Sequence, residues 1–150
     1  MRARRWAIGL ALALGAASVT AGTGYAVAAS GASDPPLGPG LVTVDVGIDQ
    51  SRFDIGALRV VEGTTVEFVV RNDDPIDHEL IVGTPDVHRA HATGEELSHP
   101  PVPGEVSVAP DQVASTYYEF TDAGSIVYAC HLPGHVAYGM HGTIEVVEAG

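Results

Sequence analysis

The sequence predicts an all-β protein, an antiparallel β-sandwich of about seven or eight strands. Short runs rich in β-branched and aromatic residues recur along the chain after residue 40. Clusters of glycine, proline and aspartate separate these runs, and no long stretch shows the 3.6-residue apolar period of a helix. Many short strands divided by turn signals are typical of a two-sheet sandwich.

The individual runs support this fold class in chain order. The first, with the sequence LVTVDVGI, alternates apolar and polar residues, as expected for a strand with one face in the core. Turn signals follow at Glu62-Gly63 and at Asp73-Asp74-Pro75. The predicted strands are residues 41–48, 57–61, 64–72, 78–83, 104–110, 114–120, 124–130 and 142–148.

Residues 84–104 stand apart from the strands. This segment, TPDVHRAHATGEELSHPPVPG, is polar and rich in histidine, glutamate and proline. We interpret it as one long polar loop. Loops of this length in compact domains are usually functional or mobile.

The first 28 residues have the composition of a signal peptide. Three arginines precede an apolar run at residues 6–19, which is short for a membrane span, and the sequence AVAAS offers a cleavage site ending at Ala28. An uncleaved anchor is the alternative, and Arg4-Arg5 is compatible with a twin-arginine export signal. We expect an exported protein, located in the periplasm or at the cell surface of a bacterium.

The rest of the chain predicts a linker and one domain. Residues 29–40 are rich in proline, glycine and serine and predict a flexible linker. Residues 41–150 are enough for one domain with a hydrophobic core. Membrane association is expected only if the N-terminal segment is retained.

The chain is strongly acidic. Its formal net charge is −12, and removal of residues 1–28 leaves four arginines, no lysine and nineteen acidic side chains, a charge of −15. This surface argues against nucleic acid, because phosphates would repel it. It fits high solubility, or docking to a partner with a basic face.

The segment YACHLPGHVAYGMHG, residues 128–142, holds the only cysteine of the chain. Cys130 therefore has no partner for a disulfide within the chain, and no signature of a catalytic cysteine is visible around it. His135 and Met140 follow at intervals of five residues. A thiolate, an imidazole and a thioether are the donors of a blue-copper site, which needs one further histidine. His78, after the turn that precedes residues 78–83, is the best candidate.

The two segments VEFVVRNDDPIDHELIV and YACHLPGHVAYGMHGTIEV together resemble those of the cupredoxins, the small blue-copper proteins. The C-x4-H-x4-M spacing is similar to that of auracyanin and rusticyanin, and the resemblance covers about residues 41–147. It implies a Greek-key β-sandwich with one copper ion per chain. The implied copper ligands are His78, Cys130, His135 and Met140.

The resemblance implies an exported carrier of single electrons between redox partners, cycling between Cu(I) and Cu(II). We expect no enzyme activity and a monomeric protein. The alternative is a copper-binding or delivery protein in metal homeostasis that uses the same ligands. Leu132, Pro133, Val136 and Ala137 could form an apolar patch beside His135, where electrons would leave.

Two residues depart from the common cupredoxin pattern. Glu79 follows the first histidine, where many cupredoxins have a small polar residue that steadies the thiolate. His131 follows Cys130 directly, and we interpret it as exposed, because adjacent strand residues point to opposite faces. Aspartates 73, 74 and 77 are assigned to shaping the turn before His78, and no catalysis is assigned to them.

The remaining histidines suggest a second metal site. His88 and His91 are three residues apart and would share a face if their segment is helical. His99, with Glu95 and Glu96, could add ligands for zinc or a second copper. A solvated polar loop is the simpler interpretation of the same residues.

Overall fold

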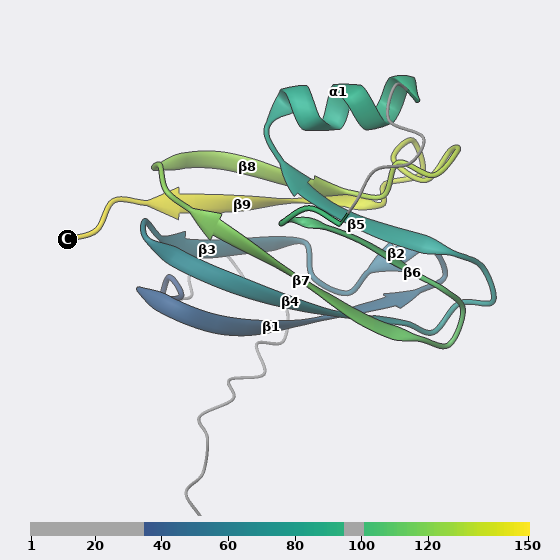
Figure 1. Ribbon diagram of the computed structural model, residues 1–150, viewed down its shortest axis with the longest axis horizontal. Coiled ribbons are helices and arrows are strands. Elements are labelled where there is room, and N and C mark those ends of the chain that lie inside the picture. Colours follow the sequence, from purple (N-terminus) through teal and green to yellow (C-terminus); the bar gives the residue numbers. More distant parts are fainter. Residues whose placement is uncertain (1–34, 95–100) are drawn as a thin grey trace, which may run out of the picture.

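The computed structural model describes residues 35–94 and 101–150 (Figure 1). The predicted signal peptide lies outside the described residues, as do Glu95, Glu96 and His99. The last part of the predicted linker is described from Pro35 onward. There Leu37 forms a bridge with Val60.

Within the described residues, nine strands form two sheets that pack face to face, so the predicted β-sandwich is confirmed (Figure 1). One sheet has the order β2-β1-β4-β7 and the other the order β3-β9-β8-β5-β6. The strands are β1 (Gly40–Asp49), β2 (Arg52–Phe53), β3 (Ala57–Val61), β4 (Thr64–Asn72), β5 (His78–Gly83), β6 (Glu105–Val108), β7 (Val113–Phe120), β8 (Gly124–Ala129) and β9 (His141–Val147).

The expectation of a purely antiparallel sandwich is wrong. β1 pairs with β4 in parallel, and β3 pairs with β9 in parallel, while the other neighbours are antiparallel. The cause is the path of the chain, which leaves the first sheet to form β3 before it returns as β4. Strands separated by such a crossover can lie side by side in the same direction.

Alternating residues of the strands fill the space between the sheets. From β4, the side chains of Val66, Phe68 and Val70 are fully buried. Tyr128 of β8 is also fully buried, and its hydroxyl donates to the carbonyl of Ile55. The buried apolar cluster includes Cys130 and Met140.

A helix begins the segment that was predicted to be a long polar loop. α1 (Pro85–Thr93) has proline at its N-terminus and ends at Gly94, whose φ of 69° is left-handed and whose N–H donates to the carbonyls of Ala90 and His91. These are ordinary start and stop signals, which the polar composition obscured. α1 lies outside the sandwich, next to β5 (Figure 1). Gly83 allows this approach, because a Cβ there would lie 2.9 Å from the Val87 side chain.

Among the described residues, no helix is long and apolar enough to cross a membrane.

Candidate metal centre

Three residues from different parts of the chain meet at one end of the sandwich. His78 is the first residue of β5, Cys130 follows β8, and His135 lies in the loop between β8 and β9. One donor atom from each lies within 4.8 Å of the others, the only such group of three or more among the described residues. The Cys130 Sγ is 3.2 Å from the His135 Nδ1.

Backbone hydrogen bonds close the loop that carries Cys130 and His135. The Cys130 N–H donates to the Met140 carbonyl over 3.1 Å, and the Met140 N–H donates to the His135 carbonyl over 3.0 Å. The His135 N–H donates to the Leu132 carbonyl over 3.0 Å, which closes a tight turn at Pro133-Gly134. Met140 is fully buried beneath this loop.

Two glycines of this region have different roles. Gly139 has a φ of 92°, a left-handed conformation that favours glycine directly before Met140. A Cβ at Gly142 would collide with the Tyr128 hydroxyl, so this glycine makes room for a core side chain.

His78 is held by a buried carboxylate that the sequence interpretation assigned only to a turn. Its Nε2 lies 2.8 Å from the Asp74 Oδ2. The backbone N–H groups of Gln50 and Ser51 donate to the same carboxylate, each over 2.7 Å. Burial raises the pKa of Asp74, but the hydrogen bonds from Ser51, Gln50 and His78 outweigh it, so the pKa is lowered. Asp74 is therefore an anion at neutral pH and fixes the orientation of the imidazole.

The other ring nitrogen of His78 faces the candidate centre. His78 is 1% exposed, and its Nδ1 is buried with no hydrogen-bond partner in the described structure. A buried polar atom without a partner is costly, and a metal ion would satisfy it. The orphaned nitrogen thus fits a ligand position next to Cys130 and His135.

Asn72 builds the turn between β4 and β5. Its side chain is fully buried, and its Oδ1 accepts from the Asp74 N–H over 3.0 Å. Its Nδ2 donates to the carbonyls of Ile76 and Val108. This amide therefore fixes the position of Asp74, which in turn holds His78.

Burial shifts the pKa values of Cys130 and His135 in the directions that favour their neutral forms. It raises the pKa of the Cys130 thiol, against hydrogen bonds from the Glu79 and Leu132 backbone that lower it. Burial also lowers the pKa of His135, helped by the nearby His78. A metal ion binds the thiolate, so its entry must displace the proton of Cys130.

Glu79, the first departure from the common pattern, contacts the chain beside the thiol. Its Oε1 accepts from the His131 backbone N–H over 2.7 Å. The carboxylate therefore ties β5 to the residue after Cys130. A small polar residue could not bridge this gap with its side chain.

His131 is not exposed, contrary to the prediction. Its side chain points away from the core, as expected from alternation, but α1 covers that face. The Nε2 of His131 lies 2.8 Å from the Nδ1 of His88, and its ring stacks on that of His91 with centroids 5.9 Å apart. The pKa of His131 is lowered to about 4, mainly by burial and also by repulsion from His88 and His91. The ring is therefore neutral at pH 7.

The predicted second site is described only in part. His88 and His91 do share one face of α1, where both contact His131. His91 also lies 3.3 Å from the Glu105 carboxylate. His99 lies outside the described residues, so a site of His88, His91 and His99 stays a prediction.

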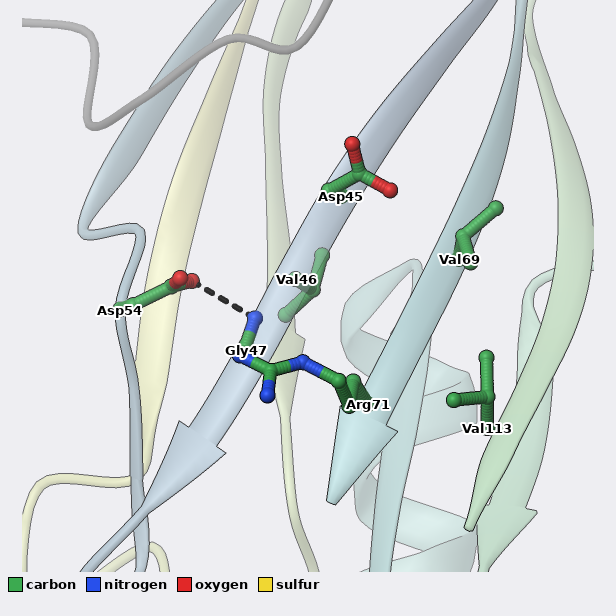
Figure 2. A pocket seen from close by; sticks show the side chains of 7 residues that line it. All are labelled: Asp45, Val46, Gly47, Asp54, Val69, Arg71 and Val113. Atoms are coloured by element: carbon green, nitrogen blue, oxygen red, sulfur yellow. Dashed lines mark hydrogen bonds between the residues drawn. The ribbon is translucent and has the colours of Figure 1, made fainter. Parts of the chain in front are cut away.

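A hollow elsewhere on the molecule offers no comparable donor set. It lies over β1 and β4 and has a volume of about 240 Å³. Figure 2 shows Asp54 hydrogen-bonded to the Gly47 backbone across the edge of this hollow. Arg71 beside it pairs with Asp73 at 2.7 Å. Asp54 and Arg71 thus have structural partners.

Comparisons with known proteins agree with this geometry. Residues 41–147 match the family model for copper binding proteins of the plastocyanin/azurin family. The chain is 38% identical over 102 residues to the copper-resistant cuproprotein CopI of Rubrivivax gelatinosus, which is 65% of this chain and 61% of that protein. It is 25% identical over 137 residues to CopI of Pseudomonas aeruginosa, covering 69% and 75% of the two chains. The chain thus spans about three fifths of the Rubrivivax relative.

Solved structures with the same fold include two auracyanins. Reduced auracyanin from Roseiflexus castenholzii superposes with a TM-score of 0.60 at 20% identity, over 70% of this chain and 96% of that one. Auracyanin A from Chloroflexus aurantiacus superposes with a TM-score of 0.57 at 21% identity, over 71% of this chain and 99% of that one. Both likenesses concern the fold. The family match and the His-Cys-His donor group show that copper is the cofactor and that the chain belongs to the plastocyanin/azurin family of copper-binding proteins, the cupredoxins.

Proposed function

We propose that this protein carries single electrons at a type 1 copper site. The ligands would be the Nδ1 of His78, the Sγ of Cys130 and a ring nitrogen of His135, with Met140 as the weak axial ligand. The observation that carries the proposal is the convergence of the first three donors within 4.8 Å. Two imidazoles and one thiolate, with a thioether on the axis, are the donor set of blue-copper sites.

The protein frame suits rapid electron transfer because it holds the donors in nearly one arrangement. When bound, copper supplies a one-electron couple between Cu(I) and Cu(II). Asp74 fixes the ring of His78, and the hydrogen bond from the Cys130 N–H to the Met140 carbonyl fixes the two ends of the loop. His78, Cys130 and Met140 are at most 1% exposed, so water is excluded from these donors. Little reorganisation is then needed between the two oxidation states.

We assign electron exit to the surface around His135. Val136 and Tyr138 of the same loop are 38% and 76% exposed. The formal net charge of the chain is −12, which supports a redox partner with a basic docking face. We expect a monomer that has no enzyme activity and does not bind nucleic acid. The predicted signal peptide supports export to the periplasm or cell surface of a bacterium.

Copper handling is the second candidate function. It is favoured by the relatives, which are named copper-resistant cuproproteins. Such a role would use the same ligands but require the copper ion to leave at a useful rate. The buried position of three of the four donors favours retention, and therefore electron transfer.

The visible spectrum of the Cu(II)-loaded protein tests the ligand assignment. We expect an intense thiolate-to-copper charge-transfer band, which Cys130→Ser abolishes. A wild-type spectrum with only weak Cu(II) absorption would contradict the type 1 site.

A second experiment separates the two functions. Electron exchange with a small redox reagent is measured by stopped flow, and Cu(I) release to a chelator is measured on the same preparation. Electron transfer predicts fast reversible exchange and slow release. Fast release of Cu(I) would favour copper handling.

A further inference from the structure

A cavity of about 440 Å³ lies between α1 and the end of β8. His88 of α1 and His131, the residue after Cys130, contribute to its wall, together with apolar side chains such as Val127 and Val136. Val136 belongs to the loop of the candidate copper centre. The cavity is therefore next to that centre but is separated from it by the backbone at Cys130-His131.

The hydrogen bonds of His88 determine which of its nitrogens is free to act as a ligand. Its Nε2 lies 3.0 Å from the Val127 carbonyl, which can only accept, so this nitrogen carries the proton. The Nδ1 of the neutral ring then has a lone pair, and it faces the Nε2 of His131 at 2.8 Å. The arrangement resembles that of metal-bound histidines, which donate their second N–H to a carbonyl or carboxylate.

We propose that His88 Nδ1 and His131 Nε2 form a second copper-binding site in this cavity. Two metal–nitrogen bonds of about 2.0 Å at a right angle place their nitrogens about 2.8 Å apart, as at adjacent corners of a tetragonal Cu(II) site. A tilt of the two rings turns both lone pairs into the cavity, and water completes the coordination. The proton on His131 Nε2 leaves when the ion binds.

Neighbouring groups hold His131 in place for this role. Glu79 accepts from its backbone N–H, and the ring of His91 stacks on its ring with an interplanar angle of 20°. The site consists of two imidazoles, which agrees with the finding that only His78, Cys130 and His135 form a group of three donors among the described residues. It differs from the sequence-based prediction, because His131 replaces His99.

The two sites would be coupled through one peptide unit. Cys130 and His131 are consecutive, and the Cys130 Sγ contacts His135 whereas the His131 Nε2 contacts His88 of α1. A cation on His131 would therefore stabilise the reduced, less positive form at Cys130 by charge repulsion. The reduction potential of the first copper should rise when the second site is filled.

Copper stoichiometry of the full chain tests the second site. The protein is dialysed against excess Cu(II), and bound copper is measured by atomic absorption. We expect two copper ions per chain, the second with an electron paramagnetic resonance signal split by two nitrogens. His88→Gln removes the imidazole but keeps a residue that favours helix. We expect this variant to bind one copper ion per chain. His141→Gln is the matched control, because His141 lines the same cavity outside the pair, and should bind two.

Equal stoichiometry in wild type and His88→Gln would overturn the second site, as would a wild type that binds only one copper. Cys130→Ser separates this proposal from the proposed function. If the Cys130→Ser protein binds one copper that the added His88→Gln change removes, the second site stands without the first. If the thiolate-to-copper band is present but the number of bound copper ions does not depend on His88, the second site is overturned and the proposed function is not.

Discussion

The Asp74 Oδ2 lies 2.8 Å from the Nε2 of His78, and both side chains are buried. The carboxylate is an anion that accepts two further backbone N–H groups, so it is fixed before any metal binds. A carboxylate that accepts the N–H of one nitrogen of a ligand imidazole makes the other nitrogen, which binds the metal, a stronger donor. The relationship therefore bears on the affinity and the reduction potential of the copper site.

Asp74→Asn should raise the reduction potential of the bound copper. The amide oxygen can still accept from His78, but the negative charge that favours Cu(II) is lost. A redox titration followed at the charge-transfer band measures the change. Asp73→Asn is the matched control, because Asp73 is an exposed residue of the same turn that pairs with Arg71. Equal potentials in the wild type and Asp74→Asn would show that the carboxylate does not tune the site.

Met140→Leu should retain copper and raise its potential. Leucine has a similar volume and preserves the packing of this fully buried position, but it removes the proposed sulfur ligand. Cyclic voltammetry gives the potential, and metal analysis confirms that one type 1 copper remains. An unchanged potential would remove Met140 from the axial position.

Gly142→Ala should destabilise the protein. The added Cβ would collide with the Tyr128 hydroxyl in the core, and overpacking of this kind costs about 1–3 kcal/mol. Urea unfolding of the copper-free protein measures the loss. Gly56→Ala provides the comparison, since a Cβ there meets no atom within 4 Å. Similar unfolding midpoints for the two variants would contradict the packing argument.

The copper-free protein should lose stability as the pH falls from 6.5 toward 4. The pKa of His131 is lowered from 6.5 to about 4 by burial and by the adjacent histidines, so in this window the unfolded chain binds a proton that the folded protein does not. Proton binding to the unfolded state favours unfolding as the pH falls.

His131→Asn should reduce this dependence on pH. Urea midpoints at pH 7, 6, 5 and 4 test the expectation in both proteins. His141→Asn is the control, since the same substitution there leaves His131 in place. Parallel curves for the wild type and His131→Asn would mean that His131 does not carry the effect.

The strands could be predicted because their signals are local. Alternation identified β1, and the eight predicted runs correspond to all the described strands except the two-residue β2. α1 was missed although Pro85 and Gly94 mark its ends, because polar composition was given more weight than capping signals. The parallel pairing of β1 with β4 has no local signal, since it depends on which sheet the chain enters next.

The sequence by itself predicted three donors within one loop, because Cys130, His135 and Met140 lie within eleven residues of one another. Only the tertiary structure decided which distant groups join them. The pairing of β5 with β8 brings His78 and its carboxylate partner to Cys130, and the docking of α1 brings His88 to His131. Contacts of this kind depend on strand register and helix packing, which no short stretch of sequence specifies.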